Sequence, residues 1–142
     1  MKKHQFIGLL ICLGLIFIFS SCKKEKDCDY NQKVVISETE YKNAPNDPGM
    51  KIVNMEIVGD CLKIKFNSSG CSGSSWVVKL IDRGDLIKTN PPQRTLILSL
   101  YNTEMCEALI HKEVSFNIKD LQVEGTKKVE LNISGESILY RY

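Results

Sequence analysis

The stretch Leu62-Lys63-Ile64-Lys65-Phe66 alternates apolar and basic side chains without a break. Successive side chains of a β-strand point to opposite faces of a sheet, so this alternation turns one face to a core and the other to water. The spacing therefore predicts a half-buried strand. The same alternation recurs in four further stretches of the chain: 96–100, 114–118, 129–133 and 138–142.

Three other runs are rich in β-forming residues, and turn signals separate most of the predicted strands. The additional runs are 34–41, 52–58 and 76–81. Turns are expected at Gly59-Asp60 and at Arg83-Gly84-Asp85. A further turn is expected at Pro91-Pro92, because proline lacks the backbone donor that a central strand needs. The pattern predicts an all-β fold: a small antiparallel β-sandwich, Ig-like or barrel-like.

One stretch has a helical composition instead. Residues 104–111, centred on Met105-Cys106-Glu107, predict one short helical turn near Cys106. Residues 42–50 are rich in proline and asparagine and are expected to form a loop.

The N-terminus carries an export signal. Lys2 and Lys3 precede an apolar run over 6–19, which is shorter than the roughly 20 residues of a membrane-spanning helix. Ser20, Ser21 and Cys22 then fit a bacterial lipobox, although Phe19 stands where leucine is usual. We expect a signal peptide over 1–21, lipidation of Cys22, a tether over 22–32 and a single β-sandwich domain over 33–142. A signal anchor and a cleaved signal without lipid are the alternatives.

The export signal also accounts for the net charge of the chain. It holds Lys2 and Lys3 and no acid, so the mature chain has 19 − 2 = 17 basic residues against 17 acidic ones. A near-neutral chain has no basic field for nucleic acid. The expected partners are the membrane, through the lipid anchor, and a protein or a glycan. Lys23, in place of an aspartate, favours the outer membrane.

Four cysteines remain after Cys12 and Cys22 are set aside. An even number in an exported chain predicts disulfides, and spacing does not choose among the three possible pairings. We favour Cys71–Cys106 with Cys28–Cys61, each closing a loop of about 35 residues. Antiparallel pairing of 76–82 with 95–101 would bring Cys71 and Cys106 to the same end of a sandwich. Free buried thiols are the alternative, and the absence of a CxxC pair disfavours zinc.

Few residues suggest a catalytic or ligand-binding site. The loop 68–75, rich in glycine and serine, is interpreted as a connection pinned at Cys71, with an anion-binding nest of backbone N–H groups or a nucleophilic Cys71 as alternatives. His111 is interpreted as a solvated residue. Trp76 is expected in the core, with a sugar-stacking platform as the alternative, to which Tyr101, Tyr140 and Tyr142 would contribute.

Several motifs resemble small lipoproteins common in Bacteroidetes-type bacteria, over most of residues 50–142. The motifs are Cys61-Leu62-Lys63-Ile64, Ser69-Gly70-Cys71, Pro91-Pro92, Met105-Cys106-Glu107-Ala108 and Val114-Ser115-Phe116-Asn117-Ile118. Ser69 replaces a second glycine of that pattern, and no histidine follows Cys71 closely, so no role of that histidine is carried over. The resemblance implies a lipidated β-domain with a Cys71–Cys106 bridge and implies no activity.

These features predict a non-catalytic binding or accessory module anchored in the outer membrane, with no cofactor or metal. The alternatives are an envelope structural subunit and a small thiol- or metal-dependent protein that uses Cys71 or His111.

Overall fold

The computed structural model describes residues 32–142. The signal peptide, Cys22 and Cys28 therefore lie outside the described residues. Strands make up most of the described chain, which confirms the all-β class. Within this part of the chain, no helix is long and apolar enough to cross a membrane.

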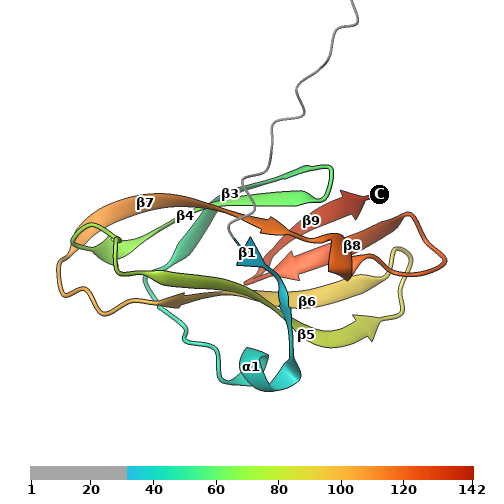
Figure 1. Cartoon of the computed structure of the whole chain (residues 1–142), viewed down its shortest axis with the longest axis horizontal. Coiled ribbons are helices and arrows are strands. Elements are labelled where there is room, and N and C mark those ends of the chain that lie inside the picture. Colours follow the sequence, from blue (N-terminus) through green and yellow to red (C-terminus); the bar gives the residue numbers. More distant parts are fainter. Residues whose placement is uncertain (1–31) are drawn as a thin grey trace, which may run out of the picture.

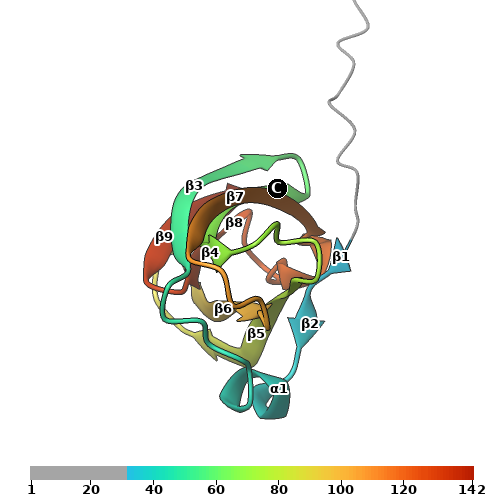
Figure 2. The same ribbon diagram turned by 90° about the vertical axis from the view of Figure 1, so that its left-hand side faces the viewer.

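Two sheets pack face to face (Figures 1 and 2). The first has the order β1 (Gln32–Lys33), β7 (Ala108–Asn117), β4 (Cys61–Gly70) and β3 (Lys51–Val58). The second has the order β2 (Val35–Ile36), β5 (Val77–Ile87), β6 (Gln93–Tyr101), β8 (Lys128–Ile133) and β9 (Glu136–Arg141).

The sheets are mixed, which corrects the prediction of a purely antiparallel sandwich. Parallel pairs join β1 to β7, β2 to β5, and β6 to β8. The N-terminal segment forms two of these pairs. Its strand β1 belongs to the first sheet and β2 to the second, and buried Val34 lies between them. The third arises because the chain crosses between the sheets after β7. The sandwich is open rather than barrel-like, since β3 and β9 are the far edges of separate sheets.

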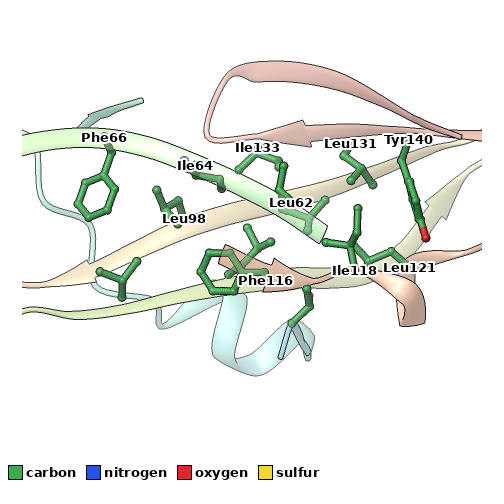
Figure 3. Close-up of a cluster of buried hydrophobic side chains, with 14 of the residues drawn as sticks. Leu62, Ile64, Phe66, Leu98, Phe116, Ile118, Leu121, Leu131, Ile133 and Tyr140 are labelled. Carbon is green, nitrogen blue, oxygen red and sulfur yellow. The ribbon is translucent and has the colours of Figure 1, made fainter. Parts of the chain in front are cut away.

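The predicted alternation supplies the core, shown in Figure 3. Leu62, Ile64 and Phe66 of β4 are at most 1% exposed. The opposing sheet contributes side chains buried to the same degree: Leu96, Leu98, Leu100, Val129, Leu131, Ile133 and Tyr140. One continuous core between two amphipathic sheets is what strict period-two patterns produce.

Strand β5 runs through the predicted turn at 83–85, so that prediction is wrong. The register shifts between Asp82 and Leu86, where the extra residues form a bulge. Gly84 adopts a φ of +89° there and donates its N–H to the carboxylate of Asp82. Asp82 is fully buried and lies 3.4 Å from Arg94. The strand continues past these contacts to Ile87 instead of reversing.

The helical turn predicted near Cys106 is also wrong. Residues 102–107 have no regular structure, and β7 begins at Ala108. Pairing with β4 over the whole length of β7 overrides the local helical preference.

Two short helices form elsewhere in the described chain. Helix α1 (Glu38–Lys42) ends the run over 34–41 that was expected to be a strand. Ser37 caps it by accepting a hydrogen bond from the Glu40 N–H at 3.2 Å. A 3₁₀ turn, η1 (Lys119–Leu121), follows β7.

The sandwich has two ends that differ in their loops. The disulfide end consists of the loops 43–50, 71–76 and 102–107, and the opposite end consists of 59–60, 88–92 and 118–127. Ala108 of β7 lies at the disulfide end, whereas Phe116 lies beside Gln32, where the described chain begins. The strand rise separates these two positions by about 25 Å.

Candidate functional site

The disulfide end takes its name from the bond between Cys71 and Cys106. Their Cα atoms are 4.8 Å apart, and both residues are exposed. Antiparallel pairing of Val77 with Tyr101 brings the two loops together, as predicted. Cys61 is also disulfide-bonded and is buried, and Cys28, its expected partner, lies outside the described residues.

The loop after β4 forms a nest of backbone N–H groups around the carboxylate of Glu104. Oε2 of Glu104 accepts hydrogen bonds from the N–H groups of Cys71, Ser72 and Gly73 at 2.6, 2.9 and 2.9 Å. The Ser75 hydroxyl donates to Oε1 at 2.9 Å. The anion-binding nest considered from the sequence therefore exists, and the anion that fills it belongs to the protein itself.

Glycines make this close approach possible. A Cβ atom at position 70 would lie 2.6 Å from Oε2 of Glu104 and 2.8 Å from the Trp76 ring, and Gly73 has a φ of +67°. The N–H groups of Gly73 and Ser72 make the largest contributions that lower the pKa of Glu104 to about 2. The carboxylate is thus charged throughout the physiological pH range.

Trp76 covers this nest rather than presenting a platform. Its ring lies 6.0 Å from that of Phe66, and the residue packs against the core. The Nε1 atom is buried and makes no hydrogen bond to a described residue. Tyr140 is fully buried and the hydroxyl of Tyr142 bonds to Val123, so Tyr101 is the exposed member of the predicted aromatic set.

A second carboxylate ties loop 43–50 to the same end. Asp47 accepts hydrogen bonds from Ser68 Oγ at 3.0 Å, Asn102 Nδ2 at 3.1 Å and the Gly49 N–H at 2.8 Å. Burial by itself would raise the pKa of Asp47, but these hydrogen bonds lower it overall. Asn102 also accepts a hydrogen bond from the Glu104 N–H, which joins the two carboxylates in one network.

An apolar hollow of about 320 Å³ opens beside this network, on the outer face of the second sheet. Its walls include Val77, Ile81, Tyr101, Ala44 and Pro45. Val77 and Tyr101 lie directly opposite each other and are 50% and 54% exposed. A polar hollow of about 480 Å³ adjoins it, shares Pro45 and Tyr101, and is lined by both Asp47 and Glu104.

The remaining candidate residue, His111, is not part of this arrangement. It lies on β7 opposite Asn67, faces away from the core, and its side chain makes no hydrogen bond or ion pair to a described residue. No group of three or more His, Cys, Asp and Glu residues in the described chain is placed to hold a metal ion.

Sequence reasoning missed three residues that organise the disulfide end: Asp47, Asn102 and Glu104. Asn102 and Glu104 carry a local signal, since an asparagine readily accepts a hydrogen bond from the N–H two residues later. Nothing local links Glu104 to loop 71–76, because the two are brought together only by the pairing of β5 with β6.

No protein-family model and no curated protein matches the chain. Two solved structures, both from Bacteroides, are similar to it in fold. A NigD-like immunity protein from Bacteroides caccae superposes with a TM-score of 0.58 at 13% identity, covering 78% of this chain and 58% of that protein. A protein of unknown function (DUF1344) from Bacteroides vulgatus gives 0.53 at 21% identity, covering 78% and 55%. The likeness concerns the fold alone. This chain spans less than two thirds of either protein.

Proposed function

We propose that this protein is a lipid-anchored binding module of the bacterial outer membrane and that its ligand site is the disulfide end. The observation that carries the proposal is the pair Val77 and Tyr101, which keep about half of their surface in solvent beside a hollow. Exposed apolar groups that gather at a concave surface are typical of binding sites.

The surroundings of this pair hold it in place before any ligand arrives. The Cys71–Cys106 disulfide, the four hydrogen bonds to Glu104 and the three to Asp47 fix all three loops of the disulfide end. A site that is ordered in advance loses less conformational entropy when it binds. Bonded cysteines also favour binding over thiol catalysis, since Cys71 is not a free nucleophile here.

The position of Gln32 supports an outward-facing site. The described chain begins beside Phe116, at the far end of β7 from the disulfide end. If Cys22 carries the lipid, the membrane lies on the side of Gln32, and the disulfide end extends away from it. Replacing Cys22 by Ala removes the sulfur that accepts the lipid, so acyl labelling should disappear. Acyl labelling that persists in Cys22→Ala would contradict the anchor.

Site-specific photo-crosslinking in intact cells tests the ligand site. A crosslinking amino acid at position 101 should give an adduct of defined mass, and the adduct should disappear when Val77 is changed to Ser. The control position is Val53, a β3 valine that is 57% exposed and lies outside the disulfide end. Adducts at 53 and none at 101 would contradict the proposal and would favour an envelope subunit that presents the edge of its sheet.

A further inference from the structure

We propose that the disulfide end binds a basic segment of a partner protein, with an apolar side chain in the hollow beside Tyr101 and a lysine or arginine next to Asp47 and Glu104. This inference rests on the proposed function and names the chemistry of its ligand.

The apolar part of the site is small. A volume of about 320 Å³ is at the lower limit of ligand pockets, which range over roughly 300–1,000 Å³. The hollow therefore fits one large side chain of a peptide better than an extended ligand. Val77 and Tyr101 form its exposed wall, and Ile81, only 2% exposed, lies deeper in it.

The loops at the disulfide end carry a net negative charge. Loops 43–50, 71–76 and 102–107 contain Asp47, Glu104 and Glu107 and no lysine or arginine, so their net charge is 0 − 3 = −3. The loops of the opposite end contain three basic and three acidic residues and are neutral: Lys88, Lys119, Lys127, Asp60, Asp120 and Glu124.

The basic residue at the hollow does not offset this charge. Lys79 lies 3.4 Å from Glu40, which also lines the hollow. Neither Asp47 nor Glu104 forms an ion pair with a described residue, although Lys112 of β7 reaches the nest, where its Cε would lie 2.7 Å from a Cβ atom at position 73. Complementary charge gives an interface its specificity and its association rate.

The hydrogen bonds of the network favour a ligand that donates. Asn102 Nδ2 gives its two hydrogens to Asp47 and to the Ser69 carbonyl, and Ser68 gives its hydroxyl proton to Asp47. The N–H groups of 71–73 and the Ser75 hydroxyl all donate to Glu104. These donors are thus in use, and Trp76 Nε1, which makes no hydrogen bond to a described residue, is buried. Ammonium and guanidinium groups only donate, whereas a sugar hydroxyl also seeks donors. A basic peptide suits this surface better than a glycan.

Peptide pools of matched length test the inference on the full chain, purified from membranes in mild detergent. One pool combines lysine or arginine with leucine or phenylalanine, the second replaces the basic residues by glutamate, and the third replaces the apolar residues by serine. Fluorescence anisotropy should show the first pool binding about tenfold more tightly than either of the others. Raising the salt from about 50 mM to about 500 mM should weaken this binding several-fold.

Exposed variants locate the binding without disturbing the core. Val77→Ser and Tyr101→Ser should each weaken binding of the basic–apolar pool by about tenfold. Val53→Ser is the matched control, because Val53 is a strand valine with an exposure of 57%, close to the 50% of Val77. It should leave binding unchanged.

Equal binding of the basic and acidic pools, or equal losses in Val77→Ser and Val53→Ser, would overturn the inference. Binding of an oligosaccharide panel that is lost in Tyr101→Ser would overturn the ligand class and leave the binding end in place. Crosslinking from position 101 without binding of any pool would do the same. A failure to crosslink from position 101 would instead overturn the proposed function.

Discussion

Two tyrosines on the second sheet show how differently the two ends are built. At the opposite end Tyr140 is fully buried, its hydroxyl donates to Asp60, and Gln122 Nε2 donates to that hydroxyl at 2.8 Å. At the disulfide end Tyr101 leaves 54% of its surface in solvent. The first tyrosine completes the core, whereas the second forms the wall of a hollow. One end thus uses an aromatic residue for stability, and the other keeps one available for contact.

The two ends also differ in the interactions that hold their loops together. The opposite end is closed from within by buried side chains such as Ile118 and Leu121. The disulfide end is closed by an exposed covalent bond and by charged hydrogen bonds to Glu104. The disulfide and the hydrogen bonds hold the loops in place and do not bury the apolar surface of Val77 and Tyr101. That surface stays available to a ligand.

The largest expected effect is loss of the fold when a charge enters the closed core. Leu131→Asp places a carboxylate at a site with 0% exposure, and an unpaired buried charge costs a large part of a total stability of about 5–15 kcal/mol. We expect no cooperative unfolding transition in urea, as followed by circular dichroism. Val77→Asp, at the half-exposed wall, should stay within about 1 kcal/mol of the wild type. Similar losses in both variants would contradict the difference between the ends.

The second effect concerns the disulfide. Cys71→Ser combined with Cys106→Ser should lower the free energy of unfolding by about 2–4 kcal/mol, because the open loop regains entropy in the unfolded chain. The β-type circular dichroism spectrum should persist, since the core lies between the sheets and not at this bond. A variant with no folded structure would show instead that this bond is needed for the core to form.

The same substitution at the two tyrosines gives a smaller and sharper contrast. Tyr140→Phe removes the hydroxyl that bonds both Asp60 and Gln122 and leaves only the bond of 3.3 Å between those two residues. This loss should cost about 2 kcal/mol. Tyr101→Phe should leave the unfolding free energy unchanged, because its side chain is half exposed. Urea titrations of both variants measure the difference. Equal losses of unfolding free energy in the two variants would mean that Tyr101 stabilises the fold rather than lining a ligand site.

The smallest effect is local and depends on pH. The pKa of Glu104 is lowered to about 2, below the ordinary value of about 4.3. The contribution of its hydrogen bonds is therefore fully present above the ordinary pKa and is lost as the pH falls through about 2. The amide resonance of Gly73 should shift with a midpoint near this lowered pKa, and the shift should be absent in Glu104→Gln. A midpoint at the ordinary value would show that the carboxylate is not held in the nest.

The sequence patterns predict the core better than they predict the site. Leu62, Ile64 and Phe66 are fixed by a period that depends only on neighbouring residues, and they lie where that period puts them. The Cys71–Cys106 bond follows from one correct strand pairing. The helix expected around Cys106 fails because β4 holds residues 108–117 in a strand. The bond from Glu104 to Gly73 spans 31 residues and exists only in the folded chain.

Helix α1 is a different kind of miss. Ser37 and Glu40 have the spacing of a helix N-terminus, and this signal was present in the sequence within a run read as a strand.

Hydrogen exchange in native membranes tests most directly whether the disulfide end is the ligand end. Exchange is compared between the full chain in its own envelope and the same chain purified in detergent. The expected result is slower exchange in the envelope for 43–50, 71–76 and 102–107, with 59–60 and 118–127 unchanged. Slower exchange confined to the opposite end, or no difference at the disulfide end, would contradict it.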